Sequence, residues 1–311
     1  MSAMQPTYSL IIPHFNDPVR LERLLCSVPV AREDVEVIVV DDCTPDQSAL
    51  DTVRAHWPRV QWLSTPENGG AGIARNVGLD AARGRWLVFA DSDDEFLPGA
   101  FETFDRVLRA DDELVYFLAE AVQEVDGTPS SRAIRANELC RGYFDEPSKS
   151  NLERLRFGHV VPWAKVYSRR FVEERGLTFD ETRVSNDVGF NVLASVQAGS
   201  VTVVPEKIYR VFRRADSLTA DESLSSMLER IRVLSRLNRR LAALGTPGRM
   251  HAAGYLYRGL IKGPRAFVCV VRETLAGGLL WPTIRQLSPD EIREFLRRVK
   301  RDRREQRRIR T

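Results

Sequence analysis

An apolar run that stops abruptly in a cluster of acids constrains the fold of this chain more than any other feature. The run Trp86-Leu-Val-Phe-Ala90 is followed directly by Asp91-Ser-Asp-Asp-Glu95. A short, continuously apolar segment is typical of a strand that is buried on both faces in a parallel sheet. We therefore expect the acids at the carboxyl end of that strand, the edge where open α/β sheets bind their ligands.

Further apolar runs alternate with segments of helical spacing. Strands are predicted at residues 8–13, where Pro13 ends the run, and at 35–40, 60–63, 86–90 and 114–119. Helices are predicted at residues 19–28, 49–56 and 72–82, and later strand-containing segments at 160–171 and 201–209. This alternation predicts an α/β fold with a doubly wound, mainly parallel sheet. Residues 126–150 are rich in turn-forming types, and we expect an irregular excursion there.

From about residue 219 the pattern is helical to the end of the chain. Helices are predicted at residues 223–244, 249–262 and 288–308. We expect two parts: an α/β domain over residues 1–220 and a helical C-terminal extension over residues 221–311 with a basic tail.

Composition narrows the class of protein. The net charge is only +3, but residues 293–310 are strongly basic, which indicates either a solvated helix or a peripheral contact with anionic membrane lipids. Phe295 is the one aromatic residue in that tail, too little for a nucleic-acid stacking platform, so no nucleic acid is expected. Four scattered cysteines, no leader pattern and no run of 18 apolar residues predict a cytoplasmic protein that at most rests on the inner face of a membrane.

The acidic cluster has a chemistry of its own. Asp91 and Asp93 would repel each other unless a cation lies near both. Hard oxygen ligands without a nearby His or Cys favour Mg²⁺ or Mn²⁺, and these ions take remaining ligands from water and substrate phosphates. A bare D-x-D pattern also fits a solvated acidic turn that leads into a helix after Pro98, and both readings stay open on this motif alone.

Four sequence blocks occur in order, and together they favour the metal site over the solvated turn. They are Tyr8-Ser-Leu-Ile-Ile-Pro-His-Phe-Asn16, Glu36-Val-Ile-Val-Val-Asp-Asp-Cys-Thr44, Asn68-Gly-Gly-Ala-Gly-Ile-Ala-Arg-Asn-Val-Gly-Leu79 and Trp86-Leu-Val-Phe-Ala-Asp-Ser-Asp-Asp94. This set resembles the N-terminal blocks of the family 2 glycosyltransferases, which have the GT-A fold. The resemblance covers residues 7–100 closely and extends more loosely to about residue 220.

The resemblance implies a nucleotide-sugar donor site. It assigns the donor nucleotide to residues of all four blocks: Pro13, Phe15, Asn16, Asp41, Asp42, Asn68, Arg75, Asp91 and Ser92. Of the acid pair at the second strand end, we favour Asp42 for the nucleoside and expect the other acid to cap the turn. Packing of Arg75 against a neighbouring carboxylate is the structural alternative to a contact with base or phosphate. Asp93 and Asp91 are implied as metal ligands for Mn²⁺ or Mg²⁺.

Later segments carry the rest of the implied chemistry. Asp187, in Ser185-Asn-Asp-Val-Gly-Phe190, matches the family's general base, with a helix cap as the alternative; Asn186 stands where relatives usually have Glu. Trp163 lies in a segment similar to the family's tryptophan-x-lysine strand on the acceptor side, although a core position is equally compatible. Arg213, Arg214 and Ser217 match a loop that covers the donor diphosphate.

The resemblance implies metal-dependent, inverting transfer of a sugar from a nucleotide-diphosphate donor, with a UDP-sugar expected. The implied acceptor is a hydroxyl of a glycan, lipid-linked or polymer molecule, as in cell-surface polysaccharide synthesis. One alternative is a catalytically inactive sugar-nucleotide-binding module. Another is a nucleotidyltransferase of related fold, which is disfavoured because no glycine-rich triphosphate loop follows the first strand. The absence of G-x-G-x-x-G at that position likewise disfavours a dinucleotide-dependent oxidoreductase.

Overall fold

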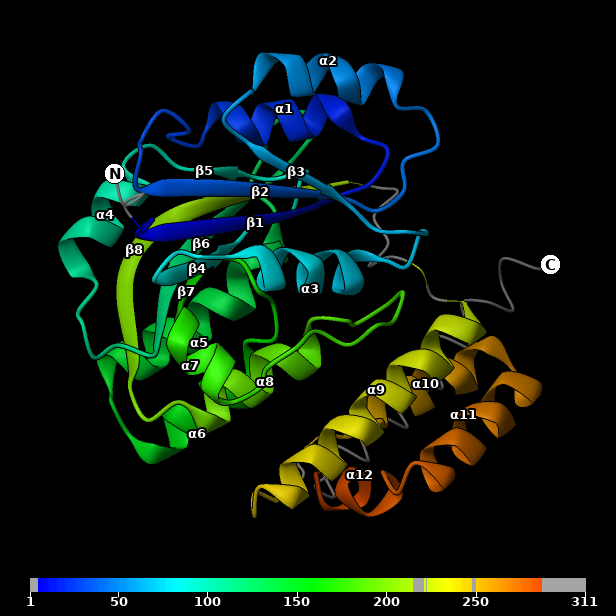
Figure 1. Ribbon diagram of the computed structural model, residues 1–311. Helices are drawn as coiled ribbons and strands as arrows, with labels where there is room; N and C mark the ends of the chain where they lie inside the picture. The colour runs from blue at the N-terminus through cyan, green and yellow to red at the C-terminus, as the bar shows by residue number, and fades with distance from the viewer. Residues whose placement is uncertain (1–4, 215–220, 222, 248–249, 287–311) are drawn as a thin grey trace. The chain divides into compact units, whose positions relative to one another are not determined.

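Two compact units make up the chain. The computed structural model describes residues 5–214, 221, 223–247 and 250–286. Contacts within the chain separate residues 1–217 from residues 218–311. The first unit contains a large sheet with helices on both faces, and the second is helical (Figure 1).

The first unit is built on an eight-stranded sheet with the order β3-β2-β1-β4-β7-β6-β8-β5. Its strands are β1 (Tyr8–His14), β2 (Val35–Asp41), β3 (Gln61–Ser64), β4 (Trp86–Phe89), β5 (Glu95–Phe96), β6 (Leu114–Gln123), β7 (Lys165–Ser168) and β8 (Val201–Arg213). Pairing is parallel from β3 through β4 and between β6 and β8, whereas β7 and β5 run antiparallel to their neighbours. The predicted mainly parallel α/β sheet is confirmed.

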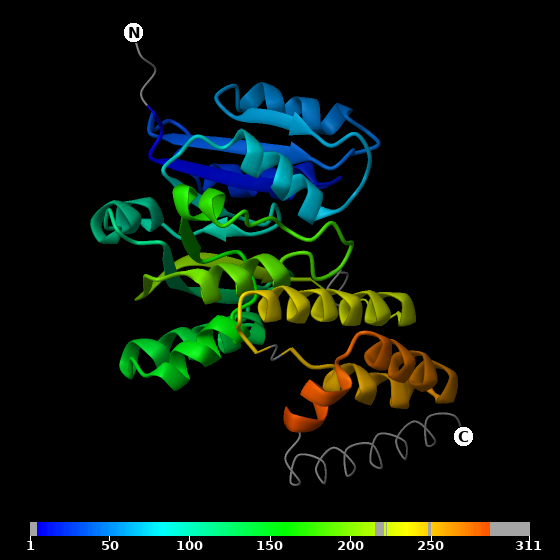
Figure 2. The ribbon, with the colours of Figure 1, turned by 60° about the horizontal axis from the view of Figure 1, so that its bottom comes forward.

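Helices cover both faces of this sheet. They are α1 (Pro18–Cys26), α2 (Ser48–His56), α3 (Ala71–Ala81), α4 (Ala100–Val107), α5 (Ile134–Asp145), α6 (Lys149–Gly158), α7 (Arg169–Glu174) and α8 (Val188–Gln197). Figure 1 shows α1 and α2 on one side and α3 and α8 on the other, and Figure 2 looks onto the side of α3 and α8. Local signals start several of them; Asp17, for example, caps α1 by accepting from the Arg20 amide, 3.4 Å away, with Pro18 at the first helical position.

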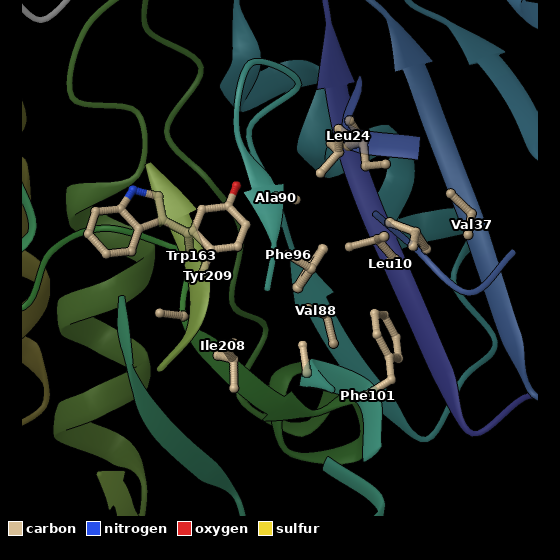
Figure 3. Close-up of a cluster of buried hydrophobic side chains, with 14 of the residues drawn as sticks. Leu10, Leu24, Val37, Val88, Ala90, Phe96, Phe101, Trp163, Ile208 and Tyr209 are labelled. Carbon is tan, nitrogen blue, oxygen red and sulfur yellow. The ribbon is translucent and has the colours of Figure 1, made fainter. Parts of the chain in front are cut away.

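Central strands are apolar on both faces because helices bury each face. Leu10 and Ile12 belong to the core that includes the buried side chains of α1 and α4 (Figure 3). Ile11 points to the opposite face, where a Cβ added at Gly78 of α3 would collide with it. That close approach is the reason α3 needs a glycine there.

An aromatic cluster on this second face holds α8 against the sheet. Phe89 of β4 makes edge contacts with Tyr167, Phe179 and Phe190, with ring centroids 5.1–5.6 Å apart. Phe179 and Phe190 stack, with centroids 4.1 Å apart. This cluster fixes where the N-terminus of α8 begins.

Two local expectations were wrong. Residues 126–150 are not irregular: they contain a 3₁₀ turn (Ser131–Ala133) and α5, which buries Ala136 and Cys140. The Asn137 amide bonds the amide and carbonyl of Ala119 on β6, a tertiary contact that sequence periodicity could not reveal. The first strand also continues past Pro13, because at that point β4 has ended and Pro13 pairs with Val40 of β2 alone.

The second unit is described by itself. It contains α9 (Leu224–Ala243), α10 (Ala253–Lys262), α11 (Pro264–Ala276) and α12 (Leu280–Gln286). Arg232 of α9 pairs with Glu273 of α11 at 2.9 Å. The helix predicted at 288–308 lies outside the described residues. Among the helices described, none has the length and apolarity needed to cross a membrane.

Candidate functional site

The candidate site lies at the carboxyl ends of the parallel strands. The Asp42 amide donates to the His14 carbonyl at 2.7 Å, which joins the ends of β2 and β1. The Thr65 amide donates to the Asp41 carbonyl at 3.0 Å and joins β3 to the same edge. The end of β4 carries Asp91 beside them in the sheet order.

The acid pair after β2 is buried and already hydrogen-bonded. Asp41 accepts from the hydroxyl and amide of Thr44 and from Gln47, at 2.5–3.2 Å. Asp41 therefore closes the turn, as expected for one member of the pair.

Asp42 holds the glycine loop that precedes α3. It accepts from the Thr65 hydroxyl at 2.9 Å and from the amides of Gly69 and Gly70 at 3.1 and 2.7 Å. Gly70 has a φ of 93°, a conformation that favours glycine. The Asp42 carboxylate thus sets the backbone path of the predicted donor loop.

Arg75 connects two distant segments at the site. Its guanidinium donates to Asp91 Oδ1 at 2.6 Å and to Asn186 Oδ1 at 2.9 Å. The residue is 5% exposed and lies over the Phe179 ring, 5.3 Å from its centroid. The side chain therefore connects the acidic turn after β4, residues 91–94, to Asn186, which precedes Asp187.

Residues of β8 hold the acidic turn in place through hydrogen bonds. The Tyr209 hydroxyl accepts from the Asp91 amide at 2.9 Å, and Asp94 accepts from the Phe212 amide at 2.9 Å. Asp94 is 2% exposed, and burial together with the charges of Asp91 and Asp93 raises its pKa. Asp94 is a structural anchor of this turn.

Asp93 is half-buried and faces a cation. Burial and the nearby charge of Asp91 raise the pKa of Asp93, and Arg214 opposes that shift. Arg214 Nε lies 3.5 Å from Asp93 Oδ2, and Arg214 Nη1 lies 3.2 Å from Asp17 Oδ2. The Asp93 carboxylate is therefore in a place where added positive charge is stabilising.

The acidic turn has the donor chemistry for a hard divalent cation. Among the described residues, no group of three or more His, Cys, Asp or Glu side chains gathers as a metal cage. Mg²⁺ and Mn²⁺ sites in nucleotide enzymes commonly use one or two carboxylates, with water and substrate phosphate as further ligands. Burial and the nearby charge of Asp91 raise the pKa of Asp93, and a bound divalent cation would offset both effects, so the oxygen donors of Asp91 and Asp93 fit such an ion.

Asp187 is half-buried at the N-terminus of α8. It occupies the N-cap position, yet its side chain makes no capping hydrogen bond. Burial raises the pKa of Asp187; the Asp91 charge adds to this effect, whereas Arg75 and Lys165 oppose it. A carboxylate that is not used as a cap and has a raised pKa is suited to accept a proton.

The other predicted residues lie in different surroundings. Phe15 is 46% exposed, Asn16 and Asn68 are exposed, and Ser92 is half-buried in the acidic turn. Arg213 is exposed at the end of β8, which extends through residues predicted as a loop. Ser217 lies outside the described residues.

Trp163 is a core residue in this structure. It is 2% exposed, and its indole stacks on the Tyr209 ring with centroids 6.0 Å apart (Figure 3). The ring supports Tyr209, which in turn holds the acidic turn. The predicted contact with an acceptor sugar stays a prediction that this burial disfavours.

Sequence reasoning missed three polar residues beneath the site. Tyr209 bonds the acidic turn, and Lys165 and Asn191 form a buried pair with an oxygen–nitrogen distance of 2.7 Å. Lys165 and Tyr209 lay in segments already singled out, but nothing in the spacing indicated their partners. A lysine within an apolar strand was the available signal, since lysine is rarely fully buried without a partner.

Comparisons with known proteins agree on one family. The sequence profile described as Glycosyl transferase family 2 matches residues 9–176. Succinoglycan biosynthesis protein ExoO of Rhizobium meliloti is 32% identical over 227 residues, covering 69% of this chain and 63% of ExoO. Poly(ribitol-phosphate) beta-N-acetylglucosaminyltransferase TarS of Staphylococcus aureus is 25% identical, covering 65% of this chain and 35% of TarS.

Solved structures agree on the fold. The crystal structure of S. aureus TarS 1-349 in complex with UDP-GlcNAc matches with a TM-score of 0.56 at 19% identity, covering 87% of this chain and 73% of that one. Mannosyltransferase PcManGT from Pyrobaculum calidifontis, in complex with GDP-Man and Mn²⁺, matches with a TM-score of 0.53 at 15% identity, covering 89% of this chain and 76% of that one. This chain therefore spans less than two thirds of ExoO but most of the matched structures.

Replacement of Arg75 by Met tests the bridge between the acidic turn and the α8 loop. The change leaves the partly buried Asp91 carboxylate without its partner, and we expect a loss of about 2 kcal/mol of unfolding free energy. Urea denaturation measures it. The control is Arg106→Met, which removes an exposed ion pair with Glu206 and should change stability by less than about 0.5 kcal/mol. Equal effects of the two substitutions would contradict the bridging role.

Proposed function

Because this chain belongs to Glycosyl transferase family 2, we propose that it transfers a sugar from a UDP-sugar to a hydroxyl of a glycan, lipid-linked or polymer acceptor, with inversion at the anomeric carbon. The first unit, residues 1–217, would carry this reaction, and residues 218–311 would form an appended helical part. The observation that carries the proposal is the Arg75 bridge, which ties the acidic turn to the segment bearing Asp187 at one edge of the sheet.

The nucleotide would lie over the ends of β1, β2 and β4. Phe15 is exposed enough to pack on a base, and Asn16 and Asn68 offer exposed amides beside it. Pro13 shapes the end of β1, and Asp41 would close the turn after β2. Asp42 is the acid that we propose for the nucleoside, and it would also hold the Gly69–Gly70 loop close to the donor.

Asp91 and Asp93 would hold Mn²⁺ or Mg²⁺, with Ser92 between them in the same turn. A bound divalent ion neutralises the donor diphosphate and makes it a better leaving group. Mn²⁺ is present in the PcManGT complex, which has the same fold. Arg75 would hold the Asp91 carboxylate in a fixed direction through its 2.6 Å contact.

Asp187 would remove the proton from the acceptor hydroxyl. Its carboxylate is not used to cap α8, and burial raises its pKa, which makes the group a better proton acceptor than an ordinary carboxylate. Attack by the activated hydroxyl from the side opposite the departing diphosphate inverts the anomeric carbon. Asn186 accepts from Arg75 where relatives usually carry a second acid, so the base has no neighbouring Glu in this chain.

Arginine side chains near the end of β8 would meet the departing nucleotide. Arg214 lies close to Asp93, and Arg213 is exposed on the next residue, so both can contribute positive charge as negative charge builds on the diphosphate. Ser217 would add a hydroxyl on the same segment. Trp163 would act from the core, through its stack on Tyr209.

The acceptor class follows from relatives. ExoO is named for succinoglycan biosynthesis, and TarS for transfer to poly(ribitol-phosphate). A polysaccharide or other cell-surface polymer, built in the cytoplasm, is the acceptor that we propose. A catalytically inactive binding module is the rival function, and the variants below distinguish the two.

The second unit would contact an anionic membrane surface. Arg and Lys outnumber Asp and Glu by more than two to one in residues 218–311, whereas acids are in excess in residues 1–217. The exposed face of α11 combines Arg265 and Arg272 with Val268 and Leu275, which are 64% and 53% exposed. Mixed basic and apolar faces of this kind rest at lipid headgroups.

A screen of nucleotide sugars tests the reaction and its metal. Release of the nucleoside diphosphate, UDP from UDP-GlcNAc and UDP-glucose or GDP from GDP-mannose, is measured with Mn²⁺ and after chelation. We expect a UDP-sugar to be hydrolysed only with Mn²⁺, and Asp93→Ala to reduce the rate at least 100-fold because a ligand to the diphosphate-binding ion is lost. The control is Glu174→Ala: Glu174 is an exposed acid on α7, which begins beside the amino end of β4, opposite the acidic turn. Hydrolysis that survives both chelation and Asp93→Ala would refute the metal role.

The pH dependence of kcat/KM tests the base. Asp187 must be ionised to accept a proton, and its pKa is raised, so activity should fall as the pH drops through a value above the usual carboxyl range near 4. Asp187→Asn should lower kcat by about 100-fold or more while UDP still binds. An inactive module would bind UDP but show no turnover with or without Asp187.

Vesicle co-sedimentation of the full chain tests the membrane contact. Binding should require phosphatidylglycerol, weaken with salt, and fall about tenfold in Leu275→Glu, which places a negative charge on the basic face. The matched control is Val125→Glu in the first unit, where Val125 is 98% exposed. Equal binding of both variants, or binding to neutral vesicles alone, would rule out this surface.

A further inference from the structure

Lys165 is a fully buried lysine at the start of β7. Its Nζ donates to the His159 carbonyl at 2.8 Å and to Asn191 Oδ1 at 2.7 Å, and lies 4.8 Å from the Tyr116 ring centroid. Within the part of the chain that the structure describes, no carboxylate forms an ion pair with it. The family resemblance suggested an acceptor-facing strand here, but this side chain points into the core.

Asn191 links this lysine to Asp187. Its Oδ1 accepts from both Lys165 and the Tyr167 hydroxyl, each at 2.7 Å. Its Nδ2 donates to the Asp187 carbonyl at 2.8 Å, beside the helical bond from the Asn191 backbone amide at 3.0 Å. The side-chain amide of Asn191 has one orientation that satisfies these contacts, because its oxygen must face the two donors and its nitrogen the Asp187 carbonyl. These bonds hold the first turn of α8 in place.

Stability alone does not explain this arrangement. Desolvation lowers the pKa of Lys165 to about 7, which means that the protein bears the cost of burying an ammonium group. Apolar residues of similar volume commonly replace buried charges without loss of stability. The charges of Lys165 and Asp187 favour each other, so the group that benefits is the acid at the site.

A second polar pair in the same core provides a comparison. The Tyr116 hydroxyl donates to Ser195 Oγ at 2.7 Å, and both residues are fully buried. Neither of these side chains is hydrogen-bonded to Asn191 or Asp187. Loss of this pair should cost stability in the same way, without any effect on the acid at the site.

We propose that Lys165 is a positioning residue: through Asn191 it holds the backbone at Asp187 and directs that carboxylate toward the acceptor. The inference rests on the proposed role of Asp187 as the base. Lys165 does not touch the acceptor; it acts through the amide of Asn191, and while protonated its charge also favours the ionised form of Asp187.

Three variants separate hydrogen bonding from charge. Donor hydrolysis is followed with Mn²⁺ and the UDP-sugar that proves active in the screen, and UDP affinity is measured by calorimetry. Lys165→Met removes both the donor and the charge, Asn191→Leu removes the amide but keeps the charge, and Tyr116→Phe is the control.

Lys165→Met should lower kcat by about 10- to 100-fold, because misplaced catalytic groups cost that much, with UDP affinity unchanged. The fall in activity of this variant at low pH, the acid limb of its pH profile, should move to higher pH. The reason is that the positive charge that lowers the pKa of Asp187 is gone. Asn191→Leu should lower kcat similarly with less movement of the acid limb. Tyr116→Phe should lose stability but keep the wild-type pH profile.

The failure of this inference differs from the failure of the proposed function. If Asp187→Asn remains active, the base assignment falls and this proposal falls with it. If Asp187→Asn is inactive while Lys165→Met keeps wild-type kcat and acid limb, the positioning role alone is refuted. Should Lys165→Met fail to fold, the double variant Lys165→Met/Asn191→Leu, an apolar pair of similar volume, supplies the same readout.

Discussion

The buried guanidinium of Arg75 is the interaction on which the rest of the site depends. A buried arginine must be paired, and here its partners come from two segments far apart in sequence, Asp91 and Asn186. The acidic turn after β4 and the loop before α8 are therefore held together by one planar group. Chemistry that needs a carboxylate from each segment would depend on this pairing, because in the described part of the chain Arg75 hydrogen-bonds to both segments.

Electrostatic balance at the site is set by burial on one side and by two cations on the other. Burial and the charge of Asp91 raise the pKa of Asp187, while Arg75 and Lys165 lower it. One of these cations lies at the edge of the sheet and the other in the core below it. The pKa of this carboxylate is thus raised without a second acid beside it, since Asn186 stands in the preceding position.

Particular elements show how far sequence reasoning reached. Strands buried on both faces, such as β1 and β4, were predictable because a short continuous apolar run is typical of a strand covered by helices on both faces. Helix α5 was not, because the contact that stabilises it, Asn137 with the Ala119 backbone of β6, joins segments that periodicity treats separately. The continuation of β1 past Pro13 was also missed. Pro13, which lacks an amide N–H, is tolerated in the strand because β4 pairs with β1 only as far as Ile11.

The sequence by itself determined the alternation of strands and helices, and hence the edge at which Asp41, Asp42 and Asp91 gather, because local patterning and the rule for parallel sheets suffice for that. Only the tertiary structure decided what each of these side chains touches. Asp42 accepts hydrogen bonds from the glycine loop, Trp163 stacks on Tyr209, and Lys165 donates to Asn191. Hydrogen bonds and ring contacts act over a few ångströms between residues distant in the chain, so their partners are fixed by packing, which no local pattern records.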